Sequence, residues 1–210
     1  MNTAYIIGAS GHGNVIASMI QGKYDTIIFV DQAPKNAQTI HQNDFFARLN
    51  EFKSSDIFLG VGKNEHRIKL YEQLVQQGKT PANCIAANAF IAHDAVIGHG
   101  VVISPGAVIG SKAIIGNNTI INTLSSVDHD CVLGNHSQIS PGVNLGGGTV
   151  IGENCFFGIK SASIPYVNIG NNAVIMAGSV VYQNIPENVM VGGIPARVVK
   201  ILNQEVTITN

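Results

Sequence analysis

The sequence predicts an α/β N-terminal domain of the Rossmann-like β-α-β type over residues 1–85, followed by a parallel β-helix of hexapeptide repeats over residues 86–210. Three observations predict this division. Residues 4–30 carry a strand, a glycine-rich loop, a helix and a strand, and residues 91–181 carry an apolar residue at nearly every sixth position. The composition, with 23 glycines and only 12% charged residues, favours a solenoid over much of the chain.

The six-residue repeat determines the second part. Fifteen of the sixteen positions from Ile91 to Val181, taken in steps of six, are large and apolar, and only Ser163 interrupts them. A second track of smaller residues precedes each of these positions by two, from Ala95 to Ser179. A period of six is too short for a helical repeat, but it fits coils of three short strands whose aliphatic side chains stack inward.

The cysteines fit this pattern without any chemistry of their own. Cys131 and Cys155 lie on the track of small residues, so we expect buried structural thiols, because a reactive thiolate needs an exposed electropositive setting. Three cysteines without a CxxC pair also favour neither a disulfide framework nor a cysteine-rich zinc site.

The N-terminal part reads as alternating strands and helices. The predicted elements are a strand at 4–8, a helix at 14–21, strands at 26–30 and 57–61, and a helix at 65–77 with Asn64 as its N-cap and Gly78 as its stop. The loop Gly8–Gly13 follows the first strand, where backbone amides and a helix N-terminus can meet an anion. Its GxxGxG pattern differs from the dinucleotide fingerprint, and the same glycines could simply permit a tight turn. Because some 85 residues are too few for a complete dinucleotide fold, a diphosphate or a nucleotide sugar fits better.

One residue of the repeats is a candidate for catalysis. His129 follows the inward Val127 by two positions, so its side chain should point away from the core. Asp128 and Asp130 flank it, and a carboxylate that accepts a hydrogen bond from imidazole orients the ring and raises its basicity. The spacing therefore predicts a general base, although a solvated surface histidine would show the same spacing.

Charge and hydropathy argue against other classes of protein. A net charge of −1 gives no broad basic field for nucleic acid. The N-terminus lacks a secretion signal and no apolar stretch is long enough to span a bilayer, so we expect a cytoplasmic protein without membrane insertion.

Four segments together carry a family resemblance: GASGHG near the start, GKNEHR after the third strand, NTLSSVDHDCVLG in the repeats and FFGIKSASIP beyond it. They closely resemble the hexapeptide-repeat sugar O- and N-acetyltransferases. The similarity is greatest to the N-acetyltransferases of UDP-4-amino sugars in UDP-N,N'-diacetylbacillosamine synthesis. The resemblance implies a left-handed β-helix, acetyl-CoA as co-substrate, no metal, and a homotrimer with active sites between subunits.

The resemblance also implies roles for residues on the acceptor side. His129 matches the family's general base and Asp130 the acid that strengthens it, a position where the family often has glutamate. Four residues match the part of the site that holds the nucleotide sugar or approaches it closely, namely Ser10, Gly11, His12 and Gly62. Asp31 matches an acid near the uridine, and Gln32 stands where a second acid can follow, which weakens the assignment of the nucleotide.

On the donor side, Gly147, Ile159 and Ala177 match positions that line the coenzyme A groove. Gln138 stands where close relatives have a histidine near the thioester carbonyl, and it can donate a hydrogen bond but cannot carry a proton. His136 could replace that histidine, although its phase differs by two residues. The closing stretch around Pro195 resembles the family's coenzyme-covering segment.

Alternative functions remain at this stage. Within the family, the chain could be an O-acetyltransferase of sialic acid or an N-acetyltransferase of GDP-perosamine. The zinc carbonic anhydrases share the β-helix but need three convergent histidines, and His93, His99 and His136 are expected at phases that do not converge with His129. A nucleotide-sugar-binding scaffold is the non-enzymatic alternative.

Overall fold

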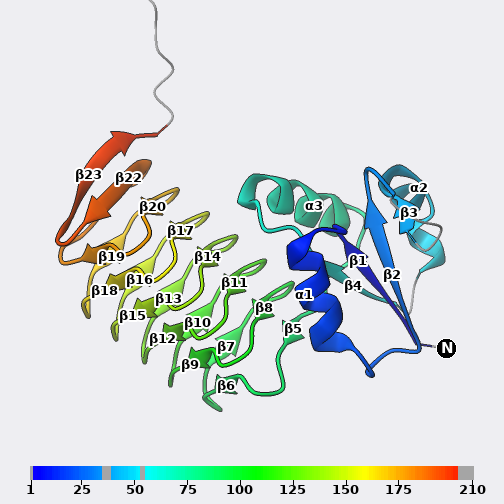
Figure 1. Cartoon of the computed structure of the whole chain (residues 1–210), viewed down its shortest axis with the longest axis horizontal. Helices are drawn as coiled ribbons and strands as arrows, with labels where there is room; N and C mark the ends of the chain where they lie inside the picture. Colours follow the sequence, from blue (N-terminus) through cyan, green and yellow to red (C-terminus); the bar gives the residue numbers. More distant parts are fainter. Residues whose placement is uncertain (1, 35–38, 53–54, 203–210) are drawn as a thin grey trace, which may run out of the picture.

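The computed structural model describes residues 2–34, 39–52 and 55–202 (Figure 1). An α/β domain lies against one end of a long three-sided β-helix, and a hairpin of longer strands closes the opposite end. None of the helices in these ranges is both long enough and apolar enough to cross a membrane.

The N-terminal domain is built on a four-stranded parallel sheet in the order β3-β2-β1-β4. Its strands are β1 (Thr3–Ile7), β2 (Thr26–Asp31), β3 (Thr39–His41) and β4 (Asp56–Leu59), and its helices are α1 (Gly11–Ile20), α2 (Gln42–Ala47), a 3₁₀ turn (Leu49–Glu51) and α3 (Asn64–Gln76). The sequence did not predict β3 and α2, because they are short and carry no clear periodicity.

Both predicted helix starts are wrong by a small margin. Helix α1 begins at Gly11 instead of Asn14, because Ser10 is the extended N-cap and the N–H of Asn14 already donates to the Ser10 carbonyl at 3.0 Å. A Cβ on Gly13 would lie 1.9 Å from the carbonyl oxygen of Gly8, so only glycine allows this close start. Helix α3 begins at Asn64 itself, with Lys63 as N-cap.

The predicted end of α3 is confirmed. Gly78 has a φ of 73°, in the left-handed region that favours glycine, and its N–H donates to the Val75 carbonyl at 2.9 Å.

Three parallel sheets form the β-helix, and successive coils are in register. Ile114, for example, pairs with Val96 before it and with Val132 after it, so one coil takes 18 residues. The five-stranded sheet contains β7 (Val96–Ile97), β10 (Ile114–Ile115), β13 (Val132–Leu133), β16 (Val150–Ile151) and β19 (Asn168–Ile169). The six-stranded sheet contains β6 (Phe90–Ile91), β9 (Val108–Ile109), β12 (Ser126–Val127), β15 (Asn144–Leu145), β18 (Ala162–Ser163) and β21 (Val180–Val181).

The third sheet has eight strands and continues into the C-terminal hairpin. It contains β5 (Cys84–Ile85), β8 (Val102–Ile103), β11 (Ile120–Ile121), β14 (Gln138–Ile139), β17 (Phe156–Phe157), β20 (Val174–Ile175), β22 (Val189–Gly193) and β23 (Ala196–Ile201). Strands β22 and β23 pair antiparallel.

The large apolar residues at every sixth position form the core of the β-helix together with the smaller residues that precede them, as the repeat predicts. Ile109, Val127 and Phe157 are fully buried, as are Cys131 and Cys155. Ser163, which interrupts the apolar track, is also buried, and its hydroxyl lies 3.2 Å from the N–H of Gly146 and 3.1 Å from the hydroxyl of Thr149. The polar interruption is therefore satisfied by hydrogen bonds.

The strands meet at three edges, and most turns place one residue there in the left-handed conformation. We call the edge between the six-stranded and five-stranded sheets the first edge (93–94, 111–112, 129–130, 147–148, 165–166). The second edge joins the five-stranded to the eight-stranded sheet (99–100, 117–118, 135–136, 153–154, 171–172). The third edge joins the eight-stranded to the six-stranded sheet (105–106, 123–124, 141–142, 159–160, 177–178).

The N-terminal domain covers one face of the β-helix. Ile16 and Phe58 belong to a buried cluster with Val102 and Ile120, which point outward from the eight-stranded sheet. Ile114, the equivalent outward residue of the five-stranded sheet, is 45% exposed. The domain therefore covers the first strands of the eight-stranded sheet and leaves the first edge open.

Candidate active site

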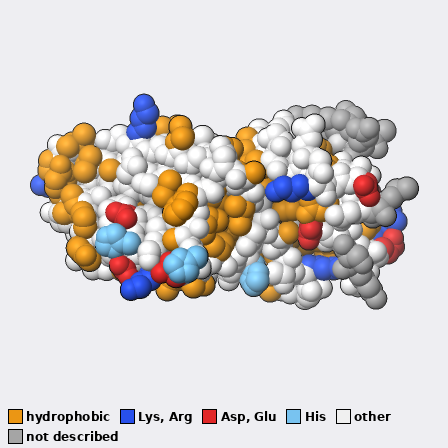
Figure 2. Space-filling view, turned by 90° about the horizontal axis from the view of Figure 1, so that it is seen from below, with side chains coloured by type: hydrophobic (Ala, Val, Ile, Leu, Met, Phe, Trp, Pro, Cys, Tyr) orange, Lys and Arg blue, Asp and Glu red, His pale blue; other side chains and the backbone are white. Residues whose placement is uncertain are grey.

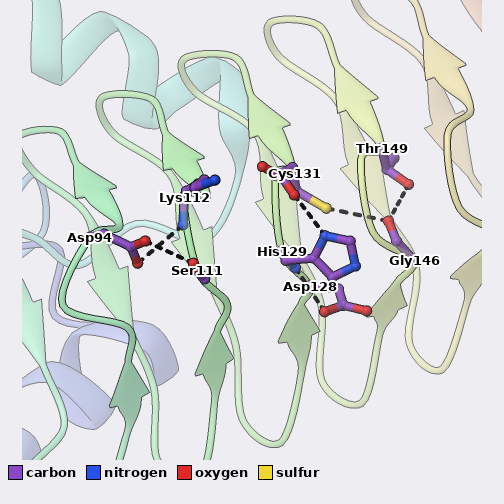
Figure 3. Close-up of polar contacts among 9 residues, drawn as sticks. Asp94, Ser111, Lys112, Asp128, His129, Cys131, Gly146 and Thr149 are labelled. Carbon is purple, nitrogen blue, oxygen red and sulfur yellow. Dashed lines mark hydrogen bonds and ion pairs between the residues drawn. The ribbon is translucent and has the colours of Figure 1, made fainter.

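His129 and Asp130 form a hydrogen-bonded pair on the first edge (Figure 3). Nδ1 of His129 lies 2.8 Å from Oδ2 of Asp130, and the two side chains are 49% and 54% exposed. With an ionised Asp130 as acceptor, Nδ1 donates the hydrogen bond and Nε2 keeps its lone pair. The imidazole is therefore oriented, open to solvent and able to accept a proton at Nε2.

The two flanking carboxylates raise the basicity of the ring. The hydrogen bond that the ring donates to Asp130 is the main cause that raises the pKa of His129, and the charge of Asp128 adds to it. The carboxylate of Asp128 also accepts the backbone N–H of His129 at 2.7 Å. Asp130 itself has a φ of 57°, a conformation that aspartate tolerates better than most residues, so the turn brings its short side chain back to the ring.

Gly147 lies against the catalytic face of His129. The two residues are on neighbouring coils of the first edge, and a Cβ on Gly147 would lie 2.5 Å from Nε2 of His129. The family resemblance predicts that Gly147 lines the coenzyme groove, and the structure adds that its missing side chain makes room for the imidazole.

A second histidine–aspartate sequence lies on the same edge. His93 precedes His129 by 36 residues, which is two coils of 18, so the expectation that it falls at another phase is wrong. Asp94 there accepts hydrogen bonds from the hydroxyl of Ser111 at 2.7 Å and the N–H of Lys112 at 3.2 Å, as Figure 3 shows. Two strand spacings, about 10 Å, separate the backbones of the two histidines.

The other histidines of the β-helix lie on the second edge. The Nδ1 of His136 is 2.9 Å from the side-chain nitrogen of Asn118, and its ring packs edge-on against Tyr71 of α3 at 5.4 Å between centroids. His136 therefore joins the two domains. Within residues 2–34, 39–52 and 55–202, no three histidine, cysteine or acidic side chains form a group that could hold a metal ion.

A cavity of about 510 Å³ opens at the carboxyl ends of the N-terminal strands. Three of the predicted substrate residues line it: Ser10, Asp31 and Gln32. The carboxylate of Asp31 accepts the N–H of Ala9 at 2.7 Å, which fixes the glycine-rich loop at the end of β1. Gly11 starts α1 beside this loop, and a Cβ there would meet nothing within 4 Å.

Sequence reasoning missed one wall of this cavity. Helix α3 contributes His66, Lys69, Leu70 and Gln73, and Gln42 of α2 also lines the cavity. The spacing of three, four and seven residues from His66 marks one face of a helix, so this signal was present in the sequence.

His12 and Gly62 lie close together. A Cβ on Gly62 would lie 4.0 Å from Cβ of His12, so glycine permits close approach without being strictly required. Burial, together with the charge of Arg67, lowers the pKa of His12 to about 4, so its ring is neutral at neutral pH. The buried Nε2 of His12 has no hydrogen-bond partner among the described residues.

The four predicted coenzyme positions do not form one groove on a single chain. Ile159 and Ala177 stack on consecutive coils of the third edge, where the N–H of Gly178 donates to the Ile159 carbonyl at 2.9 Å. Gly147 is on the first edge, and Gln138 points outward from β14 of the eight-stranded sheet. Gln138 lines a second cavity of about 410 Å³ with Gly62, Lys63 and Asn64 of the N-terminal domain.

Family models match both parts of the chain. Residues 3–74 match the PglD N-terminal domain, and residues 86–123 and 148–183 match the hexapeptide repeat of succinyl-transferase. A Saccharomyces cerevisiae protein named as an acetyltransferase is 56% identical over 48 residues, which are 22% of this chain and 24% of that protein. The chain thus aligns with about a quarter of that curated relative's length.

Solved structures match almost the whole chain. The acetyltransferase domain of PglB from Neisseria gonorrhoeae is 30% identical with a TM-score of 0.89, over 94% of this chain and 100% of that one. The same domain is also known in complex with acetyl coenzyme A. A histidine-to-asparagine mutant of perosamine N-acetyltransferase from Caulobacter crescentus, in complex with CoA and GDP-perosamine, is 31% identical with a TM-score of 0.89, over 94% of this chain and 97% of that one.

The α/β domain, the repeat fold and these relatives define a class of acyl-transferring β-helix enzymes. The chain belongs to the hexapeptide-repeat sugar acetyltransferases. The predicted family and fold class, including the left-handed β-helix, are confirmed. The roles predicted for individual residues stay predictions.

Proposed function

We propose that this protein transfers the acetyl group of acetyl-CoA to the amine of a nucleotide-linked 4-amino sugar, with a UDP-linked 4-amino-4,6-dideoxy sugar as the first candidate acceptor. The observation that carries the proposal is the His129–Asp130 pair, at 2.8 Å, which leaves Nε2 free on an exposed edge. It is supported by the relatives that are sugar N-acetyltransferases or were crystallised with acetyl coenzyme A.

The reaction needs a base and a donor for negative charge. A sugar amine that binds as an ammonium ion must lose a proton before it attacks the thioester, and Nε2 of His129 accepts that proton. As the new C–N bond forms, the carbonyl oxygen of the thioester becomes an oxyanion, for which a backbone amide or the side-chain amide of Gln138 is the donor. The thiolate of coenzyme A then leaves, and no covalent enzyme intermediate is required.

The nucleotide is assigned to the cavity of about 510 Å³ in the N-terminal domain. Ser10, Gly11 and His12 lie at the N-terminus of α1, where free backbone N–H groups favour a diphosphate. Asp31 and Gln32 line the side of the cavity proposed for the uridine, and Lys69 adds a cation to its wall. Gly62 lines the second cavity, which the N-terminal domain shares with the β-helix and toward which the sugar would extend.

The coenzyme is assigned to the β-helix between subunits. Gly147, Ile159 and Ala177 lie on two different edges of one chain, so a groove that contains all three requires a neighbouring subunit. The C-terminal hairpin β22–β23 adds a small cavity of about 240 Å³ near Pro195, which suits the segment expected to cover the coenzyme. Soluble acetyl-CoA and nucleotide sugars as substrates also support the expected cytoplasmic location.

The proposed homotrimer has a candidate surface. Val96, Ile114 and Val150 point outward from consecutive or nearby coils of the five-stranded sheet and are 58%, 45% and 41% exposed. Figure 2 shows hydrophobic side chains on the β-helix beside a group of histidine and acidic side chains. This stripe borders the first edge, so association there would place His129 at a subunit interface.

The test is mass spectrometry of products after incubation with acetyl-CoA and a panel of acceptors. The panel contains UDP-linked 4-amino-4,6-dideoxy sugar, GDP-perosamine and sialic acid. The expected result is a gain of one acetyl group on the UDP-linked amine. Acetylation of GDP-perosamine alone would replace the acceptor, as the 31% identical perosamine enzyme makes reasonable. Acetylated sialic acid would indicate O-transfer, and binding without any transfer would indicate a scaffold.

A further inference from the structure

Arg67 is a buried cation on α3 to which the proposed mechanism gives no role. Its side chain is only 1% exposed, and it belongs to the GKNEHR segment that carried part of the family resemblance. Among the residues that the structure describes, no carboxylate forms an ion pair with it. Burial lowers its pKa to about 10, which still leaves the guanidinium charged at neutral pH.

The guanidinium contacts the loop between β4 and α3 on one side. Nη1 donates to the carbonyls of Val61 at 3.3 Å and Gly62 at 3.2 Å, and Nη2 donates to Oδ1 of Asn64 at 2.9 Å. These bonds fix three positions of the loop 61–64.

On the other side, Arg67 contacts the second edge of the β-helix. Nε donates to the carbonyl of Asn118 at 3.3 Å, and Nη2 donates to the carbonyl of His136 at 3.1 Å. Asn118 and His136 are on consecutive coils. One side chain therefore joins the loop of the N-terminal domain to two coils of the β-helix.

Burying the cation of Arg67 costs free energy that burying a neutral side chain would not. A buried charge loses its hydration, and carbonyl oxygens offset that loss only when several of them are aimed at the donors. Arginine provides five N–H groups in a rigid planar fork, whereas lysine has a single flexible ammonium group. The geometry therefore requires the guanidinium shape as well as the charge.

The loop that Arg67 fixes stands between the two cavities. Val61 lines the cavity assigned to the nucleotide, and Gly62, Lys63 and Asn64 line the cavity that contains Gln138. Gly62 also lies beside His12. A shift of this loop would change both the path from the first cavity to the second and the position of His12.

We infer that Arg67 is a positioning residue: it holds the loop 61–64 on the β-helix, so that an acceptor bound in the N-terminal domain presents its amine to the β-helix in one orientation. The inference rests on the proposed function. Arg67 acts through the loop and touches no reacting atom. A displacement of about 1 Å in such a positioning element can lower a rate about a hundredfold.

The test compares Arg67→Lys with Ile20→Ala. Ile20 is 2% exposed in the cluster between α1 and the β-helix, so its truncation weakens the same domain interface without touching the loop. Amide hydrogen exchange of residues 61–64 is measured for both variants. We would also measure kcat, and KM for the UDP-linked 4-amino-4,6-dideoxy sugar and for acetyl-CoA.

Arg67→Lys should raise exchange in the loop and lower kcat about tenfold or more, because the acceptor amine is no longer held in one orientation, with KM for acetyl-CoA unchanged. Ile20→Ala should lower the melting temperature and leave both loop exchange and kcat as in wild type. Wild-type exchange or wild-type kcat in Arg67→Lys, or the same changes in Ile20→Ala, would overturn the inference.

The experiment also distinguishes failure of the proposed function from failure of the Arg67→Lys variant to fold. If the wild-type protein acetylates no nucleotide amino sugar, the proposed function fails, and loop exchange still decides whether Arg67 fixes the loop. If Arg67→Lys does not fold, Asn64→Ala takes its place, because it removes the side-chain acceptor of Arg67 and the 3.3 Å bond from Asn64 to Asn154. It should raise loop exchange and lower kcat by a smaller factor, and wild-type values of either would overturn the inference.

Discussion

Gly147 lies directly against the imidazole of His129, so close that a Cβ at this position would be 2.5 Å from Nε2. The backbone of Gly147 is not in the left-handed region, so no strain demands glycine here. Glycine is needed at this position because the imidazole of His129 occupies the space of a Cβ. A side chain here should therefore affect activity more than stability.

Gly147→Ala should displace the imidazole and lower kcat about a hundredfold, because proton transfer depends on the position of Nε2. The free energy of unfolding should change little, since the imidazole of His129 is exposed and can rotate away from the new methyl group. Steady-state kinetics and thermal unfolding check both parts. Gly78→Ala is the control: its positive φ of 73° costs stability, while activity should persist. Full activity of Gly147→Ala would contradict the close contact.

His129→Ala should lower kcat by about 10² to 10⁴, the usual contribution of a general base. Subunit association and binding of both substrates should persist, as measured by light scattering and calorimetry. His93→Ala is a matched control on the same edge, because Asp94 bonds to Ser111 and Lys112 there. Equal losses in both variants would indicate a structural effect, and unchanged turnover in His129→Ala would remove the base.

Asp130→Asn should change the pH dependence of kcat/KM. His129 acts as a base only when unprotonated, and its raised pKa means that activity falls as pH drops through a value above that of an ordinary imidazole. Since Asp130 is the main cause of the shift, its replacement should move this acid limb to lower pH and also lower the plateau. Asparagine tolerates the left-handed turn at φ 57°, so the backbone should persist.

The measurement is a pH profile of kcat/KM for both proteins under saturating acetyl-CoA. Asp128 should keep part of the shift in the variant, because its charge also raises the pKa of His129. Identical profiles would show that Asp130 has no part in the reaction.

The β-helix could be predicted in detail because its signal is periodic and local. Every coil repeats the same inward positions, and even the exception, Ser163, keeps its inward place through hydrogen bonds to the preceding coil. The same repeat predicts the outward orientation of His129. It also places His93 two 18-residue coils before His129 on the same edge, so the prediction of a different phase was wrong.

The candidate site was less predictable, because it depends on contacts between distant segments. The start of α1 at Gly11 depends on the close approach of Gly13 to Gly8, which no local propensity predicts. The bonds from Arg67 to the coils of Asn118 and His136 span 51 and 69 residues. The proposed donor groove lies between subunits, so a single sequence does not show how its parts meet: on one chain, Gly147 and Ile159 lie on different edges.

Ile114→Glu should dissociate the proposed homotrimer. Ile114 is 45% exposed at the centre of the outward stripe on the five-stranded sheet, between Val96 and Val132, and an unpaired carboxylate in an apolar interface is strongly unfavourable. Because the coenzyme groove is proposed to need two chains, activity should fall together with association. Val75→Glu, which replaces a 48% exposed residue on α3, should leave both unchanged. Light scattering of wild type and variants decides: a monomeric wild type would exclude the trimer, and a trimeric Ile114→Glu would place the interface on another face.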